Sequence, residues 1–215
     1  MTTIVNDPYI MVRDGVLPPD FCKHVIEKFE KDSRKSDGVT AEGVNKIIKD
    51  STDLLITPHA DWAHEDSIIS NTLTDLFQDY VEHVNENIIV YNRTTDDATY
   101  IHVCNTGSGS EQVDSGYQIQ KTLPGCGYIW HNDFELNPVY GIRHVTFIFY
   151  LNEVEEGWTQ FYNGDQVQPA TGRAMIFPAT WTYLHQGYPP KQTKYICTGW
   201  IHESLENLNN EKKGN

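Results

Sequence analysis

The stretch HVTFIFYL, from His144 to Leu151, alternates between two kinds of side chain. Its odd-numbered positions are all apolar, whereas its even-numbered positions mix polar and apolar groups. Because successive side chains of a β-strand point to opposite faces, this period of two predicts a strand. One face would pack on a hydrophobic core, and the other would present Tyr150 to a second environment.

The stretch KYICTGWIH, from position 194 to position 202, has the same period. Its odd-numbered positions are mostly apolar and would pack on the core. The other face carries a cation, a hydroxyl, an indole and an imidazole, from Lys194, Thr198, Trp200 and His202. Because a buried lysine needs an anionic partner, this face predicts a pocket wall where Lys194 pairs with a ligand carboxylate and Thr198 adds a hydrogen bond. Tyr150 could donate its hydroxyl to the same carboxylate.

Two helices are predicted in the first half of the chain. Pro18-Pro19 opens the first at about Asp20, and apolar residues at positions 21, 25, 26 and 29 form its buried stripe. The second runs from about Ile68 to Ile88, where apolar residues recur at helical spacing. The polar stretch from Lys31 to Ser51 is predicted to be a loop with a short helical piece.

The second half changes to short β-rich runs separated by glycine, proline and asparagine. Besides the two strands above, Ala98–Cys104, Tyr117–Thr122 and Arg173–Phe177 are predicted strands. The composition of Asn105–Asp114 predicts a flexible loop, and the end of the chain from position 205 is polar. Helices followed by antiparallel strands predict an α+β domain whose sheets fold into a barrel-like sandwich.

Length and charge set limits on the class of protein. A chain of 215 residues can bury one core, so a single domain over residues 1–215 is expected. A net charge of −14 argues against a nucleic-acid partner, which needs a basic face. Neither a signal peptide nor an apolar run of membrane-spanning length is evident, so a cytoplasmic protein without a membrane partner is expected. The oligomeric state stays open.

The triplet His131-Asn132-Asp133 is followed 54 positions later by His185, near the start of another expected strand. On a strand, residues two apart share a face, so His131 and Asp133 could reach one metal ion. His185 would complete a set of two imidazoles and one carboxylate on one side of that ion. This set leaves coordination positions open, as in non-haem Fe(II) oxygenases.

With these residues in view, the chain resembles the prolyl 4-hydroxylase branch of the Fe(II)/2-oxoglutarate dioxygenases. The matching segments are PGCGYIWHND, RHVTFIFYLNEVEEG, GRAMIFP, LHQGYP and KYICTGWIHE, with DGVLPPDFCKHVIEKF as the opening helix. The resemblance implies a double-stranded β-helix, a jelly-roll and cupin-like core, at about residues 96–203. Helical support would occupy about residues 1–95, and residues 204–215 would form a polar tail.

The resemblance also implies roles for individual residues. It makes His131, Asp133 and His185 the ligands of Fe(2+). It assigns Lys194 to the distal carboxylate of 2-oxoglutarate, with Thr198 and Tyr150 assisting and Tyr128 at the entrance of the metal site. It places Arg143, Trp200 and His202 beside the substrate proline.

The implied reaction is hydroxylation of a prolyl residue in a peptide or protein, with release of succinate and CO2. Its cosubstrates are 2-oxoglutarate and O2, and ascorbate is expected as the reductant. Two alternatives stay open: the same chemistry on a free amino acid, another side chain or a small metabolite, and a non-catalytic cupin-like metal-binding module. The presence of Lys194 and Thr198 favours the enzyme over the module.

The chain departs from the family pattern at three places. Thr122 stands where the family usually has a tyrosine, nine residues before the first histidine. The segment Gly157-Trp158-Thr159-Gln160 replaces the usual Gly-Gly-Glu-Thr and is expected to alter a loop on the substrate side. The glycine-rich segment Asn105–Asp114 has no obvious counterpart.

Overall fold

A computed structural model describes residues 3–40, 43–87, 90–91, 98–99, 112–137 and 141–203. Its main element is a nine-stranded antiparallel sheet in the order β1-β15-β12-β17-β9-β5-β2, with β11 beside β12 and β8 beside β17. The strands of this large sheet are β1 Met11–Arg13, β2 Ser36–Asp37, β5 Thr52–Leu55, β8 Gln112–Asp114, β9 Gln118–Thr122, β11 Leu136–Asn137, β12 Gly141–Tyr150, β15 Ala174–Pro178 and β17 Lys194–Glu203.

A second sheet has four strands in the order β10-β16-β13-β14. These are β10 Tyr128–His131, β13 Thr159–Phe161, β14 Gln166–Val167 and β16 His185–Gly187. One apolar cluster contains residues of both sheets, among them Ile148 and Phe177 from the large sheet and Phe161 and Val167 from the small one. The two sheets therefore pack face to face as a sandwich, which confirms the predicted α+β class and jelly-roll core.

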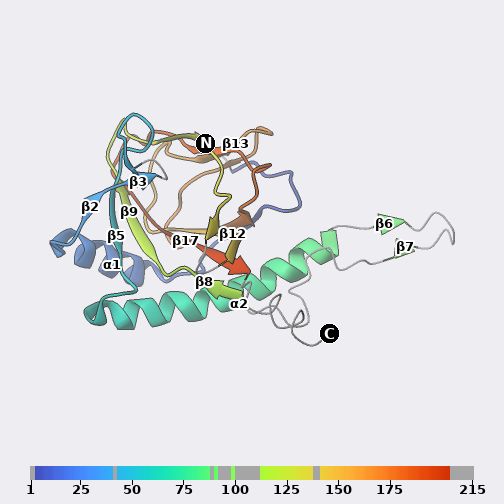
Figure 1. Cartoon of the computed structure of the whole chain (residues 1–215), viewed down its shortest axis with the longest axis horizontal. Helices are drawn as coiled ribbons and strands as arrows, with labels where there is room; N and C mark the ends of the chain where they lie inside the picture. Colours follow the sequence, from blue (N-terminus) through green and yellow to red (C-terminus); the bar gives the residue numbers. More distant parts are fainter. Residues whose placement is uncertain are drawn as a thin grey trace.

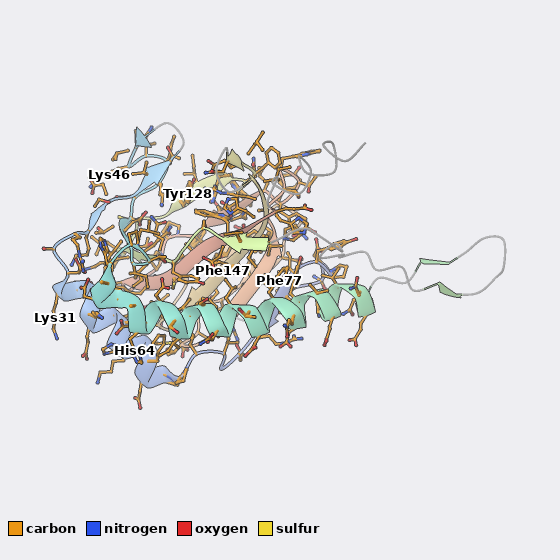
Figure 2. All side chains as sticks on the ribbon, turned by 60° about the horizontal axis from the view of Figure 1, so that its bottom comes forward. Lys31, Lys46, His64, Phe77, Tyr128 and Phe147 are labelled. Atoms are coloured by element: carbon orange, nitrogen blue, oxygen red, sulfur yellow. The ribbon has the colours of Figure 1, made fainter. Side chains whose placement is uncertain are left out.

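Two helices cover the other face of the large sheet: α1 Pro19–Lys31 and α2 Ala63–Asn87. Figure 1 shows both running beneath the strands, and in Figure 2 α2 crosses in front of them. Val25 and Phe29 of α1 and Leu73 and Leu76 of α2 share one core with Phe147 of β12. The predicted apolar stripes are thus the faces that hold the helices to the sheet.

Both helices are present where they were predicted, with shifted boundaries. The helix predicted from about Ile68 begins at Ala63, directly after the short 3-10 helix η1 Ala60–Trp62. Trp62 is fully buried and its indole N–H donates to Asp32. This aromatic anchor extends the helix toward its N-terminus, beyond the periodic apolar stripe on which the prediction rested.

The alternation of β12 is confirmed. Phe147 and Phe149 face the helices, while Ile148 and Tyr150 face the small sheet. Strand β12 lies between β15 and β17 and is buried along most of its length. Its even-numbered positions therefore face the interior of the sandwich, where a ligand cavity can form.

The stretch between α1 and β5 is not the predicted loop with a helical piece. It contains the two-residue strands β2, β3 Val39–Thr40 and β4 Gly43–Val44, followed by one hydrogen-bonded turn in which the Lys49 N–H donates to Asn45. Strand β5, which was not predicted, pairs with β9 and adds to the large sheet. Long-range pairing gives this polar stretch a structure that its composition does not signal.

Two predictions fall largely outside the described residues. Of the strand predicted at Ala98–Cys104, only β7 Ala98–Thr99 is described, and it pairs with β6 Val90–Tyr91. The predicted loop Asn105–Asp114 is described only from Gln112, and that end is strand β8 rather than loop. Neither helix described here has the length and apolar character of a membrane span.

Candidate metal centre and cavity

Two strands of the small sheet bring the histidines of the predicted triad together. Strands β10 and β16 pair antiparallel, and His131 lies directly opposite His185 in their register. The two imidazole ring centroids are 4.2 Å apart. Asp133 was predicted to lie on the same strand as His131, but β10 ends at His131. Its carboxylate reaches the same place from the loop that follows.

The three side chains converge on one point. The Nε2 atom of His131 is 3.8 Å from one carboxylate oxygen of Asp133, and the Nε2 atom of His185 is 3.6 Å from the other. All the potential ligand atoms lie within 4.8 Å of one another. Two imidazole nitrogens and one carboxylate at this spacing could hold one transition-metal ion and leave other coordination positions open.

Hydrogen bonds to the backbone orient both imidazoles. The Nδ1 atom of His131 is 2.7 Å from the carbonyl oxygen of Ile129, and that of His185 is 2.9 Å from the carbonyl oxygen of Tyr183. A carbonyl oxygen can only accept, so each Nδ1 carries a proton, and in the neutral ring Nε2 is the nitrogen whose lone pair is left for the shared point. This pattern fixes the tautomer that a metal-binding histidine needs.

The charges of the cluster also suit a cation. Burial and the neighbouring His185 lower the pKa of His131 to about 4, so its imidazole is neutral at neutral pH. Burial raises the pKa of Asp133, but its two imidazole neighbours and the hydroxyl of Thr146 outweigh this and leave the pKa below its usual value. The Thr146 hydroxyl donates to Asp133 over 2.8 Å. The site therefore offers the neutral imidazole of His131 and the carboxylate of Asp133 beside the second imidazole.

The triad lies in the wall of a cavity between the two sheets, with about 680 Å³ of space including its opening to solvent. The lining residues with polar or aromatic side chains are Lys49, Ser51, Gln120, Thr122, Tyr128, His131, Asp133, Thr146, Tyr150, Thr159, His185, Lys194, Thr198 and Trp200. The ring of Tyr128 stacks on His131 with centroids 3.5 Å apart. The cavity thus places the triad beside polar side chains that could hold a small polar ligand.

Lys194 is a buried cation of this cavity without an acidic partner in the described part of the chain. Its ammonium donates to the carbonyl of Gly157 over 2.7 Å, and burial lowers its pKa to about 8. Gly157 presents that carbonyl from a left-handed backbone conformation with φ of 69°, where a Cβ would approach Pro190 to 2.8 Å. A buried ammonium in this state favours an anionic ligand.

Thr198 and Tyr150 also line the cavity, and each already has a protein partner. The Thr198 hydroxyl donates to the carbonyl of Phe147 over 2.7 Å, and the Tyr150 hydroxyl lies 2.8 Å from that of Thr159. Ile148 stands opposite Thr198 in the β12–β17 register. The structure places Thr198, Tyr150 and Lys194 in the cavity wall on the adjacent strands β12 and β17 of one sheet, whereas the sequence predicted two separate walls.

The three residues predicted to lie beside the substrate are close together, but they do not all reach the cavity. Trp200 lines it, and the Arg143 guanidinium stacks on the Trp200 ring at 3.7 Å. Arg143 also pairs with Glu135 and stands opposite the buried His202 in the β12–β17 register. Neither Arg143 nor His202 is among the residues that line the cavity.

Sequence reasoning missed several residues of the cavity wall. Thr146 was assigned to the correct face of its strand, but its bond to Asp133 was not foreseen. Gln120 and Thr159 lie on β9 and β13 and have no local motif. Lys49 and Ser51 belong to the stretch predicted as a loop. Only the register of neighbouring strands could have brought these residues to the cavity.

The departures from the family pattern fall near Lys194. Thr122 lines the cavity and pairs directly with Lys194 across β9 and β17. Trp158 is buried and stacks on Tyr188, with ring centroids 4.2 Å apart. Because the Gly157 carbonyl accepts a hydrogen bond from Lys194, this segment lies beside Lys194 in the cavity wall.

The central segment of the chain matches a known family. Residues 117–202 match the model of the 2OG-Fe(II) oxygenase superfamily, and this range contains the triad, Lys194 and Thr198. No curated protein matches the chain. Over this segment the chain is similar to the 2OG-Fe(II) oxygenases, enzymes that use Fe(II), 2-oxoglutarate and dioxygen, and the double-sheet fold and the His-Asp-His cluster agree with that likeness.

Solved structures extend this likeness beyond residues 117–202. A prolyl hydroxylase from Trichoplax adhaerens, in complex with a hypoxia inducible factor peptide fragment, superposes with a TM-score of 0.67 at 16% identity, over 97% of this chain and 88% of its own. A Pseudomonas putida prolyl-4-hydroxylase gives 0.61 at 16% identity, over 90% and 92%. The viral collagen prolyl hydroxylase of Paramecium Bursaria Chlorella virus-1 gives 0.56 at 18%, over 90% and 95%. At these identities the likeness establishes the shared fold.

Proposed function

We propose that this oxygenase hydroxylates a prolyl residue in a peptide or protein, and that residues 1–215 work as one domain. The observation that carries the proposal is the pairing, in one cavity, of a metal-binding cluster with a buried lysine that has no acidic partner among the described residues. Similar structures that act as prolyl hydroxylases support the choice of substrate class.

His131, Asp133 and His185 would hold Fe(II), because their donor atoms already converge and both imidazoles carry the required tautomer. When bound, Fe(II) supplies the coupling of 2-oxoglutarate decarboxylation to oxidation of a substrate C–H bond by dioxygen. The protein holds the ligand set rigid: Thr146 fixes Asp133, and the carbonyls of Ile129 and Tyr183 fix the two rings.

Lys194 would bind the distal carboxylate of 2-oxoglutarate. Its ammonium is buried and unpaired by acid, so an incoming carboxylate would replace lost hydration and raise the pKa of the lysine above about 8. Because its proton is already donated to Phe147, the Thr198 hydroxyl would orient the pocket through its lone pairs. Tyr150 can rotate its hydroxyl between Thr159 and the carboxylate.

The substrate would enter on the side of Tyr128 and Trp200. Large apolar side chains flank the triad in sequence and are 41–60% exposed: Ile129, Trp130, Phe134 and Leu136. Such a group of exposed apolar residues beside a cavity favours a macromolecular partner over a small metabolite. The Arg143–Trp200 stack at the rim offers a flat polar and aromatic surface of the kind that peptides use.

The proposal is tested by incubating a proline-rich peptide with the protein, Fe(II), 2-oxoglutarate and ascorbate as the expected reductant. Mass spectrometry should find one added oxygen atom on proline, with one succinate formed for each hydroxylation. His185→Ala serves as the inactive control. Succinate formed without peptide oxidation would retain the oxygenase and overturn the peptidyl-proline substrate.

A further inference from the structure

A second lysine, Lys49, lies in the wall of the same cavity. We infer that Lys49 binds a carbonyl oxygen of the peptide substrate next to the hydroxylated residue, and so acts as a substrate-positioning residue. The inference rests on the proposed function and assigns a role to a residue outside the family-matched segment. It is carried by the position of Lys49, its charge balance and its uncommitted hydrogen-bond donors.

The backbone around Lys49 is attached to the strand that carries the metal centre. Lys49 forms a β-bridge with Tyr128, and the Ile129 N–H donates to the carbonyl of Ile48 over 3.0 Å. On the other side, the Asp50 N–H donates to the carbonyl of Gly127 over 2.9 Å. These bonds fix the position of Lys49 relative to His131 without any contact between the two side chains.

The side chain of Lys49 is buried and lines the cavity on the Tyr128 side. It is 5% exposed, and its ammonium lies 5.7 Å from the centroid of the Tyr128 ring. Tyr128 in turn stacks on His131. Lys49 therefore lies one aromatic ring away from the metal centre, where a group attached to the reacting residue would be within reach.

The charge of Lys49 is already balanced inside the protein. Its ammonium is 2.6 Å from a carboxylate oxygen of Asp53, whose other oxygen accepts a hydrogen bond from Ser51 over 2.8 Å. Asp53 pairs with Gln120 across β5 and β9, and Gln120 lines the cavity. Because this pair is neutral overall, it favours a neutral acceptor such as an amide carbonyl over a carboxylate, which would compete with Asp53.

The ammonium still has donors to offer. A lysine has three N–H donors, and within the described residues that of Lys49 makes one hydrogen bond, to Asp53. A buried donor gains most when an acceptor arrives. The neighbouring lining groups Ser51, Gln120 and Thr122 are also polar, which suits a peptide backbone more than an apolar side chain.

Lys49 could instead be present only to neutralise the buried Asp53. Suitable variants separate this structural role from substrate binding. Lys49→Met alone would leave a buried carboxylate without its partner, so the informative variant is Lys49→Met combined with Asp53→Asn. Lys46→Met is the matched control, because Lys46 lies three residues away and pairs with Asp37 on the surface. Circular dichroism and thermal melting would establish that all variants fold.

The test measures binding of a fluorescein-labelled proline-rich peptide by anisotropy, to protein loaded with Mn(II) and 2-oxoglutarate in the absence of oxygen. The double variant should bind the peptide about tenfold more weakly, the loss expected of one charge-assisted hydrogen bond. Its affinity for 2-oxoglutarate should stay within about twofold of wild type. Equal peptide affinity in wild type and double variant would overturn the inference.

A thioamide replacement identifies the group that Lys49 contacts, because sulfur accepts hydrogen bonds less well than oxygen. Replacing the carbonyl oxygen of proline, or of the residue before it, should weaken binding to wild type at one position only. The double variant should be insensitive at that position. If wild type binds 2-oxoglutarate but no peptide, the substrate class is wrong and this inference is wrong with it. If it binds neither, the oxygenase assignment itself is contradicted.

Discussion

The cavity wall contains two buried lysines, and the two lysines differ in their partners. Lys194 donates to the carbonyl of Gly157 and has no acidic partner in the part of the chain that the structure describes. Lys49 forms a 2.6 Å ion pair with Asp53. An unpaired buried cation favours an anion, whereas a paired one has hydrogen bonds but no net charge to offer. This difference in partners is the basis for proposing Lys194 as the anion-binding residue and Lys49 as a donor to a neutral group of the substrate.

The contrast also has a cost in stability. Burial lowers the pKa of Lys194 to about 8, which means that the folded protein holds the charged form of this residue unfavourably. The Lys49–Asp53 pair avoids this penalty through mutual attraction and the Ser51 hydrogen bond. A burial penalty that Lys194 bears and Lys49 avoids is expected if Lys194 is kept to bind a ligand.

The largest expected effect is that of Lys194→Met on 2-oxoglutarate. Removal of the cation should raise the dissociation constant for 2-oxoglutarate about 100-fold, because it leaves the bound carboxylate without its buried partner. Isothermal titration of the Mn(II)-loaded protein without oxygen measures this directly. The melting temperature of the ligand-free variant should not fall, since an unpaired buried charge is removed. An unchanged affinity for 2-oxoglutarate would show that Lys194 does not bind this cosubstrate.

The Lys49–Asp53 pair predicts a stability effect of the opposite kind. Asp53→Asn leaves Lys49 buried without an acid and should lower the free energy of unfolding by about 3 kcal/mol. Adding Lys49→Met should restore at least half of this loss, because the buried charge is then gone. Urea unfolding of both variants and wild type measures the difference. Additive losses in the double variant would show that the pair is not coupled.

The pH dependence of cosubstrate binding should follow Lys194. With its pKa lowered to about 8 by burial, the free protein loses the ammonium as pH rises, so affinity for 2-oxoglutarate should fall about tenfold from pH 7 to pH 9. Lys194→Met should have a flat profile over this range. A wild-type profile as flat as that of the variant would assign the anion site to another group.

The same residue predicts a change in stability with pH whose sign is opposite to that of the change in 2-oxoglutarate affinity. The folded pKa of Lys194 lies below the unfolded value, so its stabilising contribution is fully present above about pH 10.5 and is lost as pH falls through about 8. Relative to Lys194→Met, wild type should therefore gain stability as pH rises between these values. Denaturant midpoints of the two proteins at pH 7.5 and pH 10 provide the comparison.

The smallest effect is expected from Gly38→Ala, which perturbs the Lys49 end from outside the cavity. A Cβ at Gly38 would displace the Ser51 hydroxyl, which donates to Asp53, and would lie 3.1 Å from Cε of Lys49 and 3.2 Å from a carboxylate oxygen of Asp53. The crowding should raise the KM for peptide by about twofold and leave that for 2-oxoglutarate unchanged. Steady-state kinetics with either substrate varied resolves the two. A change in the KM for 2-oxoglutarate alone would contradict the assignment of Lys49 to the peptide substrate.

The two central strands and the metal-binding triad could be predicted from the sequence because the patterns that indicate them lie within short segments of the chain. The alternation of HVTFIFYL and KYICTGWIH gave the two central strands and the cavity-facing side of each, including Tyr150, Lys194 and Thr198. The spacing of His131, Asp133 and His185 predicted a cluster that the structure assembles. The period of two is visible in these strands because one face packs on the apolar core and the other faces a polar cavity.

The remainder depends on pairing between distant segments. Lys49 reaches the cavity because its backbone pairs with Tyr128, 79 positions later in the chain, and no local pattern announces that contact. Asp133 lies beyond the end of its strand, so the strand argument was wrong in its geometry although correct in its outcome. Arg143 was predicted beside the substrate; its guanidinium stacks on Trp200, which lines the cavity, and the β12 register shifts between Arg143 and Val145.

The most direct test of this division of labour is to measure succinate and hydroxylated peptide in one reaction for wild type, Lys194→Met, and Lys49→Met combined with Asp53→Asn. We expect a one-to-one yield in wild type and a parallel loss of both products in Lys194→Met. The double variant should release succinate in excess of hydroxylated peptide, because it binds the cosubstrate but positions the substrate poorly. A one-to-one yield in the double variant, at wild-type peptide KM, would contradict the account.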